Sequence, residues 1–141
     1  MTKLPPDLDP SLASRLVGTG GGALPGRMGI ELLELSAEYS IGRMPVDGNT
    51  QVLGLLHGGA HLVLGETLGS MSSAIHAGPE HYVVGIEINA THSRSITEGW
   101  VTGTCTALVL GRTLCTHEIV MTDEQGRRLS TVRMTNMVRE L

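Results

Sequence analysis

The chain has 141 residues and a formal net charge of −4, with one Trp, two Tyr and no Phe. This length suits one domain whose core is built from aliphatic side chains and methionine. The charge excludes a global basic surface for nucleic acid or an anionic membrane, and no apolar run is free enough of polar residues to span a bilayer. With no signal-peptide pattern at its start, the sequence predicts a soluble, cytoplasmic protein.

The first expected element is a short helix. Residues 1–9 are rich in Pro and Asp and are expected to be loose. Residues 10–18 suit a helix that Asp9 caps and Gly18 ends. The glycine-rich stretch 18–26 predicts a flexible loop. Because it has no strand before it and lacks the G-x-G-x-x-G spacing, a dinucleotide-binding loop is excluded.

The pattern predicts an N-terminal segment over residues 1–27 and an α+β domain over residues 28–141. Alternating apolar residues between 30 and 41 predict one long strand or a strand pair. One long helix is expected from Gly58 to His76, ended by Gly78-Pro79. Four further strands are expected over 82–90, 100–110, 113–121 and 129–138. This order predicts an antiparallel sheet wrapped around the helix, and its edges favour a dimer with a continuous sheet.

Two features of composition leave alternatives open. Cys105 and Cys115 are too few for a zinc site. If a hairpin turns near Leu110 they face each other, which allows a disulfide, although two reduced core thiols fit a cytosolic chain better. Nine of the ten basic residues are Arg, six of them from Arg94 onward. That cluster suits a phosphorylated ligand or is a set of solvated charges.

The most informative residue is Glu66, the only formally charged residue between Gly48 and Pro79. It lies in a stretch that reads as a buried helix. A buried carboxyl group costs several kcal/mol unless it is paired or protonated, so Glu66 is a candidate functional residue. Leu62, Glu66 and Ser70 lie along one helical stripe, so Ser70 is expected to donate a hydrogen bond to Glu66.

A His57-Gly58-Gly59 turn precedes Glu66, and His57 lies nine positions before Glu66. Backbone N–H groups at a helix start have no intrahelical acceptor, so that of Gly58 suits a carbonyl oxygen that becomes an oxyanion. His57 and Gln51 are candidates to position a carbonyl or a water. The other interpretation of His57 is a structural loop histidine.

The remaining residues of the long helix carry less information. Gly65 and Gly69 either make room beside the carboxyl group or pack the helix closely on the sheet. His61 and His76 are interpreted as structural. The spacing of the histidines and Glu66 matches no metal-binding motif, so no metal is expected.

These residues together resemble a known family. The run Leu56-His57-Gly58-Gly59, Glu66 with Ser70, and the segments Val84–Ala90 and His92–Ser95 resemble the hotdog-fold acyl-CoA thioesterases of the PaaI-like branch. The resemblance covers about residues 28–138. The sequence is most similar to the 1,4-dihydroxy-2-naphthoyl-CoA thioesterases. It is also similar to the proofreading thioesterases of enterobactin synthesis and to the Arthrobacter-type 4-hydroxybenzoyl-CoA thioesterases.

The resemblance implies hydrolysis of an aromatic acyl-CoA without a cofactor, because coenzyme A is part of the substrate. Glu66 is then the nucleophile or general base, and the Gly58 N–H polarises the thioester carbonyl with His57 assisting. Gln51 and Ser70 complete the catalytic set. The residues implied for coenzyme A are His92, Ser93, Arg94 and Ser95, with Arg112 and Thr113 as weaker candidates. The family also implies a site shared between two subunits, in a homotetramer built as a dimer of dimers.

Two other functions remain open at this point. A hotdog enoyl-CoA hydratase or dehydratase also combines a histidine with a carboxylate, but the nine-residue spacing from His57 to Glu66 fits thioesterases better. The other alternative is a non-catalytic acyl-CoA-binding domain. The joint presence of Glu66, Gln51 and Ser70 argues against it.

Overall fold

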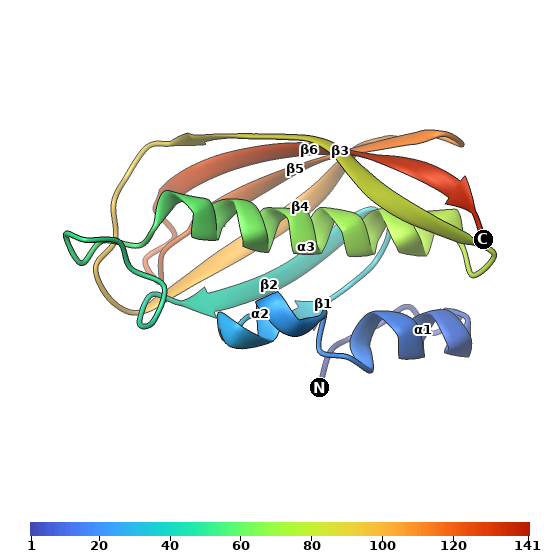
Figure 1. Cartoon of the computed structure of the whole chain (residues 1–141), viewed down its shortest axis with the longest axis horizontal. Helices are drawn as coiled ribbons and strands as arrows, with labels where there is room; N and C mark the ends of the chain where they lie inside the picture. Colours follow the sequence, from blue (N-terminus) through green and yellow to red (C-terminus); the bar gives the residue numbers. More distant parts are fainter.

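A computed structural model describes all 141 residues, and one six-stranded antiparallel sheet dominates it (Figure 1). In spatial order the strands are β1 (Glu31–Glu34), β2 (Tyr39–Pro45), β4 (Trp100–Leu110), β5 (Leu114–Thr122), β6 (Arg128–Glu140) and β3 (His81–His92). Every neighbouring pair runs antiparallel. β1 and β3 are therefore the two edges, where backbone groups are left without a partner strand.

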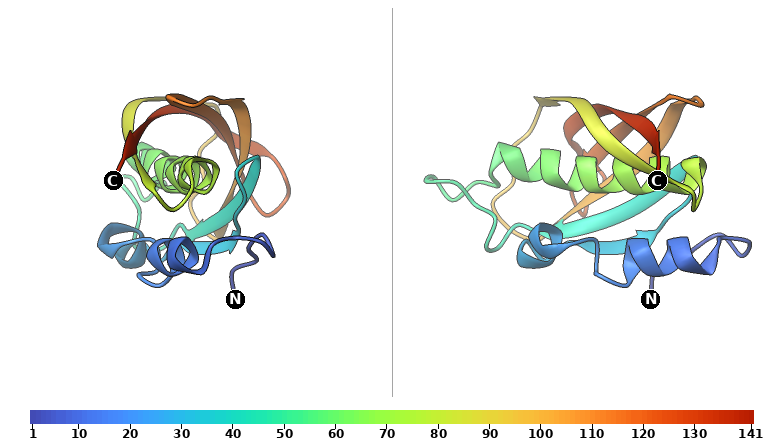
Figure 2. Two further views of the ribbon diagram at one scale, coloured as in Figure 1. Left: turned by 90° about the vertical axis from the view of Figure 1, so that its right-hand side faces the viewer. Right: turned by 45° about the vertical axis from the view of Figure 1, so that its right-hand side comes forward.

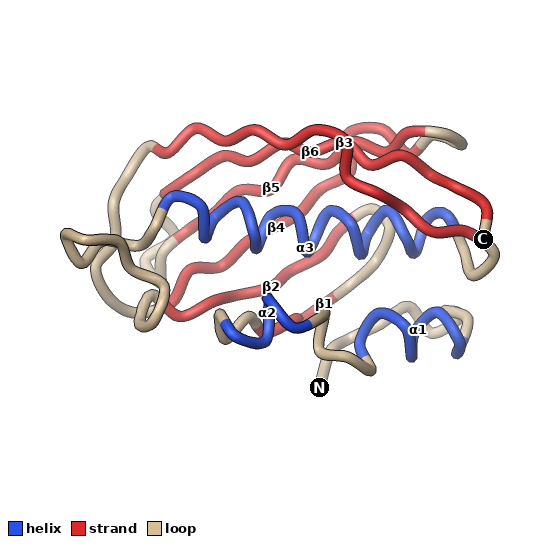
Figure 3. The backbone as a smooth tube through the Cα atoms, viewed as in Figure 1, coloured by secondary structure: helices blue, strands red, loops and turns tan.

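The single long helix, α3 (Gly58–Ala77), has 20 residues and lies along the concave side of the sheet (Figures 2 and 3). His57 is its N-cap. It ends at Gly78, whose φ of 86° is one that glycine adopts without strain. The predicted helix, Gly58 to His76, is confirmed to within one residue. No helix of the chain combines the length and apolarity needed to cross a membrane.

Glycines in the strands let the sheet approach α3 closely. A Cβ at Gly103 would lie 3.1 Å from Leu68, and one at Gly42 would lie 3.0 Å from the same side chain. Leu64 and Leu68 are fully buried at this contact. Burial of each side chain stabilises the fold by about 1.5–3 kcal/mol. The core thus fills the space between α3 and the sheet, as the hotdog arrangement requires. The predicted α+β hotdog fold is confirmed.

The N-terminal segment forms two short helices, α1 (Pro10–Val17) and α2 (Ala23–Arg27), on the side of α3 that the sheet leaves open (Figure 2). As predicted, Asp9 caps α1, and its Oδ1 accepts the N–H of Ser11 at 2.9 Å. The prediction of a flexible loop over 18–26 is wrong from Ala23 onward, where the chain forms α2. The sequence offers no strong helix signal there, and burial of Pro25 decides the conformation.

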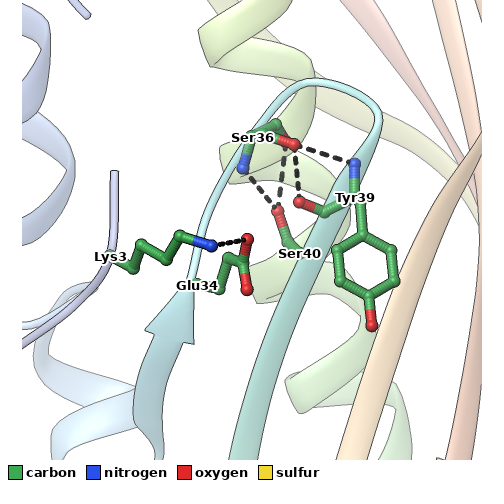
Figure 4. Close-up of polar contacts among 5 residues, drawn as sticks. All are labelled: Lys3, Glu34, Ser36, Tyr39 and Ser40. Carbon is green, nitrogen blue, oxygen red and sulfur yellow. Dashed lines mark hydrogen bonds and ion pairs between the residues drawn. The ribbon is translucent and has the colours of Figure 1, made fainter. Parts of the chain in front are cut away.

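The prediction that residues 1–9 are loose is wrong at Lys3. Its backbone N–H donates to the carbonyl of Leu33, and its carbonyl accepts the N–H of Leu35, both at 2.9 Å. The Lys3 ammonium also pairs with Glu34 at 3.0 Å (Figure 4). The start of the chain therefore lies against β1 and covers part of that edge.

Serine hydroxyls hold the turn that separates β1 from β2 (Figure 4). Ser36 Oγ donates to the carbonyl of Tyr39 at 2.7 Å, and Ser40 Oγ donates to the carbonyl of Ser36 at 3.1 Å. Ser40 Oγ lies 2.7 Å from Ser72 Oγ on α3. These contacts decide between the two alternatives for residues 30–41 in favour of a strand pair.

The later strands lie within two residues of their predicted bounds. In the turn between β5 and β6, the Asp123 side chain accepts the N–H of Gln125 at 3.0 Å. The suggestion that the two cysteines face each other is wrong. The hairpin turns at 111–113, so Cys105 lies opposite Ile119 and Cys115 opposite Leu110. Both thiols are free and buried, and burial raises the pKa of Cys105 to about 12.

Candidate active site

The first turn of α3 presents a free backbone donor. The N-cap His57 uses Nδ1 to accept the N–H of Gly59 at 2.9 Å. The N–H of Gly58 has no acceptor within the chain, because a helix leaves its first donors without an i−4 partner. With Nδ1 engaged as an acceptor, neutral His57 carries its proton on Nε2. The helix start therefore offers the free backbone N–H of Gly58, next in sequence to the capping ring of His57.

His92, the last residue of β3, packs directly against Gly58. A Cβ at Gly58 would lie 2.8 Å from His92 Nε2. Ser130 Oγ donates to the carbonyl of Thr91 at 3.3 Å and lies 2.8 Å from His92 Nδ1. The contact of Ser130 Oγ with Nδ1 leaves Nε2 of the ring facing the helix start. Ser130 thus orients His92, a role that the sequence did not indicate.

A hollow of about 350 Å³ opens beside this helix start. It is lined by the loop before α3, by the first turn of α3 and by the chain that leaves β3: Gln51, Leu55, Leu56, Gly58, His61, His92, Ser93, Arg94, Ser95 and Ile96. Gln51 Oε1 accepts the N–H of Leu53, which leaves its amide protons available. The exposed Arg94 guanidinium makes no ion pair. The structure therefore brings together most of the residues predicted for the carbonyl and for coenzyme A.

His61 also lines this hollow, although the sequence suggested only a structural role. The side chain is 4% exposed, and its Nδ1 has no hydrogen-bond partner. Its ring centroid lies 5.2 Å from that of His92. Burial, and then the charge of His92, lower the pKa of His61 to about 4. The ring is therefore neutral near pH 7.

The prediction that Glu66 is buried is wrong for the single chain, because Glu66 is exposed. Its carboxylate makes no hydrogen bond or ion pair. Its Oε1 rests against β3, 2.8 Å from where a Cβ of Gly85 would lie. The pairing of β3 with β6 shifts between Gly85 and Glu87, as at a β-bulge. A glycine inside a strand was the available signal for this close approach.

The hydrogen bond expected from Ser70 to Glu66 does not form. Ser70 Oγ donates instead to Oδ1 of Asn136 at 3.2 Å. Asn136 is fully buried on β6, and its Nδ2 donates to Ser73 Oγ at 3.1 Å. The sequence missed Asn136 because nothing in its local pattern marks it. Ser70 nevertheless lines the same groove as Glu66.

The two helix glycines pack α3 on the sheet. A Cβ at Gly65 would lie 2.9 Å from Val132, and one at Gly69 would overlap the sulfur of Met134. Both neighbours belong to β6. Of the two interpretations, close packing on the sheet is therefore correct, and neither glycine opens space beside the Glu66 carboxylate.

Glu66 lies in a separate groove of about 290 Å³. The groove runs between α3 and the N-terminal segment and is lined by Gly21, Leu24, Pro25, Val63, Glu66, Thr67, Ser70 and Met71. A Cβ at Gly21 would lie 3.2 Å from Met71, so the glycine-rich loop touches α3 here. Leu24 is 53% exposed along this wall. The N-terminal segment thus contributes an apolar wall next to the carboxylate.

Arg112 and Thr113 lie elsewhere in the chain. Arg112 borders a different hollow with His76 and His81, and His76 Nε2 lies 2.9 Å from the carbonyl of Gly111. This is the C-terminal end of α3, a helix of 20 residues and so about 30 Å long. One chain therefore does not bring these two residues to the hollow that holds His92 and Arg94. No group of three His, Cys, Asp or Glu side chains is placed to hold a metal ion.

A fold with one helix wrapped by an antiparallel sheet, a free N–H at the helix start and a carboxylate farther along the helix defines a class of proteins. Residues 53–130 match the Thioesterase superfamily. The chain belongs to this superfamily, and it is a thioester hydrolase of the hotdog fold.

Individual relatives agree with this class. The chain is 45% identical over 124 residues to the proofreading thioesterase EntH of Cronobacter turicensis, which covers 87% of this chain and 90% of that protein. Thioesterase HI1161 of Haemophilus influenzae superposes with a TM-score of 0.84 at 30% identity, covering 92% of this chain and 91% of that one. A mutant of thioesterase PA1618 of Pseudomonas aeruginosa superposes with a TM-score of 0.83 at 34% identity, covering 91% and 94%.

Proposed function

We propose that the protein hydrolyses an aromatic acyl-CoA, such as 1,4-dihydroxy-2-naphthoyl-CoA or a hydroxybenzoyl-CoA, to the free acid and coenzyme A. The observation that carries the proposal is a free Gly58 N–H and an unpartnered Glu66 carboxylate on one helix. The N–H polarises the thioester carbonyl, and Glu66 attacks its carbon or activates water. Coenzyme A enters as part of the substrate, so the reaction takes no cofactor. We propose that the protein acts in the cytoplasm.

The spacing of these two groups supports a site shared by two subunits. Glu66 lies eight positions after Gly58, which is about 12 Å along the helix axis. An oxyanion donor and an attacking carboxylate must both lie within about 3 Å of one carbonyl group. Glu66 of a second copy therefore faces Gly58 of the first, and the two separate hollows become parts of one site.

The edge strand β3 supports the same dimer. It carries three exposed apolar side chains, Tyr82 at 43%, Val84 at 42% and Ile86 at 50%, on a strand without an outer partner. Pairing β3 with its own copy satisfies its backbone groups and makes one continuous sheet. Leu108 and Val109, which are 50% and 53% exposed on β4, offer a second apolar surface through which we propose that dimers form a tetramer.

The groove beside Glu66 supports an apolar acyl group that carries hydroxyls. Leu24 and Val63 contribute apolar lining. Thr67 Oγ1 donates to the carbonyl of Val63 at 2.7 Å, and Ser70 Oγ donates to Asn136. With their protons engaged, both hydroxyl oxygens keep only lone pairs for a ligand. A ring hydroxyl of the acyl group is the donor that these oxygens suit.

The hollow beside Gly58 supports binding of the coenzyme A part. His92, Ser93, Arg94 and Ser95 line it together. Arg94 is the unpaired cation in this set, and a guanidinium suits phosphate oxygens. Arg112 and Thr113 lie at the far end of α3, so we assign them to a coenzyme A bound mainly by another subunit.

The test is a substrate panel assayed for release of free thiol. It contains dihydroxynaphthoyl-, hydroxybenzoyl-, phenylacetyl- and medium-chain acyl-CoA, and one enoyl-CoA is followed for hydration. Thiol release should be fastest with the hydroxylated aromatic thioesters, and Glu66→Gln should lower kcat by about a thousandfold or more without unfolding the protein. Hydration of the enoyl-CoA, or tight binding without thiol release, contradicts the proposal.

The role of Glu66 has its own measurement. Single-turnover hydrolysis in isotope-labelled water leaves label in the Glu66 carboxylate only if an anhydride with the acyl group forms. If Glu66 acts as general base, all label enters the product acid.

A further inference from the structure

His61 is a buried imidazole for which the fold provides no partner. It is 4% exposed, and its Nδ1 is the only buried side-chain nitrogen or oxygen in the chain without a hydrogen bond. Leaving such an atom unsatisfied costs about 1–3 kcal/mol. Unsatisfied buried groups of this kind call for a functional explanation.

The ring of His61 lies over the turn that holds Gly58. Side chains on a helix lean toward its N-terminus, so a residue covers the turn that precedes its own Cα. His61 lies three residues after Gly58 on α3. His92 supports this position of the His61 ring, because His92 contacts Gly58 and its ring centroid lies 5.2 Å from that of His61. All three line one hollow.

The surroundings of His61 determine its charge and which ring nitrogen carries the proton. Burial lowers its pKa to about 4, so the ring is neutral near pH 7 and carries one N–H. A buried N–H without an acceptor is rarer than a buried lone pair without a donor. The proton therefore belongs on Nε2. Nδ1 is buried and has no hydrogen-bond partner, whereas Nε2 is not a buried atom without a partner. The hollow beside Gly58 is where Nε2 finds an acceptor.

We propose that His61 donates its Nε2–H to the thioester carbonyl oxygen beside the N–H of Gly58, as a second oxyanion donor. This rests on the thioesterase function proposed above. As the attacking oxygen bonds to the carbonyl carbon, one carbonyl electron pair moves onto the oxygen. That pair then re-forms the double bond as the C–S bond breaks and its electrons leave with sulfur. His61 keeps its proton throughout.

A neutral imidazole suits this role. It donates a hydrogen bond without forming an ion pair with the Glu66 carboxylate of the second copy. The positive end of the α3 dipole acts on the same carbonyl oxygen. Donors of this kind act mainly in the transition state, where the oxygen carries negative charge.

The test compares His61→Met with His61→Gln. Methionine fills the site without a donor, whereas the glutamine amide places an N–H near the position of Nε2. His61→Met should lower kcat by about tenfold to a hundredfold with little change in KM, and His61→Gln should recover most of that loss. Because an unsatisfied atom is removed, His61→Met should unfold at a denaturant concentration equal to or above that of wild type.

His117 supplies the matched control. It is also a fully buried histidine, but its Nε2 lies 3.0 Å from the carbonyl of Ala37 and its Nδ1 lies 3.5 Å from Ser73 Oγ. His117→Gln should leave kcat within about twofold of wild type, because this side chain belongs to the core rather than to the hollow.

A simple S-ethyl thioester of the same acyl group locates the contact. It lacks the amides of the coenzyme A arm, so a carbonyl contact predicts the same fold-loss in His61→Met with both substrates. A loss seen only with the coenzyme A thioester, or an unchanged kcat with both, overturns the proposal. If wild type releases no thiol from any thioester, the proposed function fails first, and the two failures are thereby distinguished.

Discussion

The first turn of α3 and its middle turn differ in how completely one chain surrounds them. Around Gly58 the chain supplies a cap from His57, an oriented His92 and a hollow lined by three separate segments. Around Glu66 it supplies one apolar groove and no hydrogen-bond partner for the carboxylate. The donor side is thus largely built within one subunit, whereas the carboxylate side is open. This difference is what a site completed by a second copy predicts.

The largest effect should come from mixing two inactive variants. Glu66→Gln removes the carboxylate, and Gly58→Val blocks the donor side, because even a Cβ there would lie 2.8 Å from His92. If each site takes Gly58 from one subunit and Glu66 from the other, half of the mixed dimers' sites contain neither change. Activity after unfolding and refolding the mixture together should rise to about a quarter of wild type.

Each variant refolded alone is the control for this experiment, and gel filtration checks that both still assemble. Activity that stays at the level of the separate variants would place both groups in sites of a single subunit.

A smaller change at the donor side should also lower turnover. Gly58→Ala places a methyl group against His92 and displaces either the ring or the helix start. We expect kcat to fall by about tenfold to a hundredfold, the usual range for disturbing an oxyanion donor. Gly26→Ala is the matched control, because a Cβ there meets nothing within 4 Å. Equal kcat values for the two variants would argue against a catalytic role for the Gly58 turn.

The pH dependence of stability should depend on His61. Its pKa is about 4 in the folded chain against 6.5 ordinarily, so between these values the unfolded chain binds more protons. The free energy of unfolding therefore falls as the pH falls from about 6.5 to about 4, by on the order of 3 kcal/mol from this group. Urea unfolding of wild type and His61→Met across this range measures the difference. Parallel curves for the two proteins would contradict the prediction.

The smallest effect should come from the wall beside Glu66. Leu24→Ala removes apolar surface from the groove without touching the carboxylate. We expect kcat/KM for aromatic acyl-CoA to fall by about tenfold and that for acetyl-CoA to change little, since a few methylenes in a pocket are worth about 1–3 kcal/mol. Leu33→Ala, at an exposed leucine on β1 outside the groove, is the control. The same loss with both substrates would mean that Leu24 does not contact the acyl group.

The sequence by itself determined the helix, its ends and the residues most worth testing. Asp9, His57 and Gly78 mark helix ends through local hydrogen bonds and dihedral angles, which depend on neighbouring residues only. Glu66 was identified because it is the only formally charged residue between Gly48 and Pro79. The strand periods likewise predicted the last four strands to within two residues.

Only the tertiary structure decided what surrounds those residues. Glu66 is exposed rather than buried, Ser70 bonds to Asn136, and Gly85 rather than Gly65 or Gly69 lies beside the Glu66 carboxylate. His61 and His92 meet across a helix and a strand. Each of these contacts joins side chains whose nearness follows from how α3 packs in the sheet, and no local pattern records that packing.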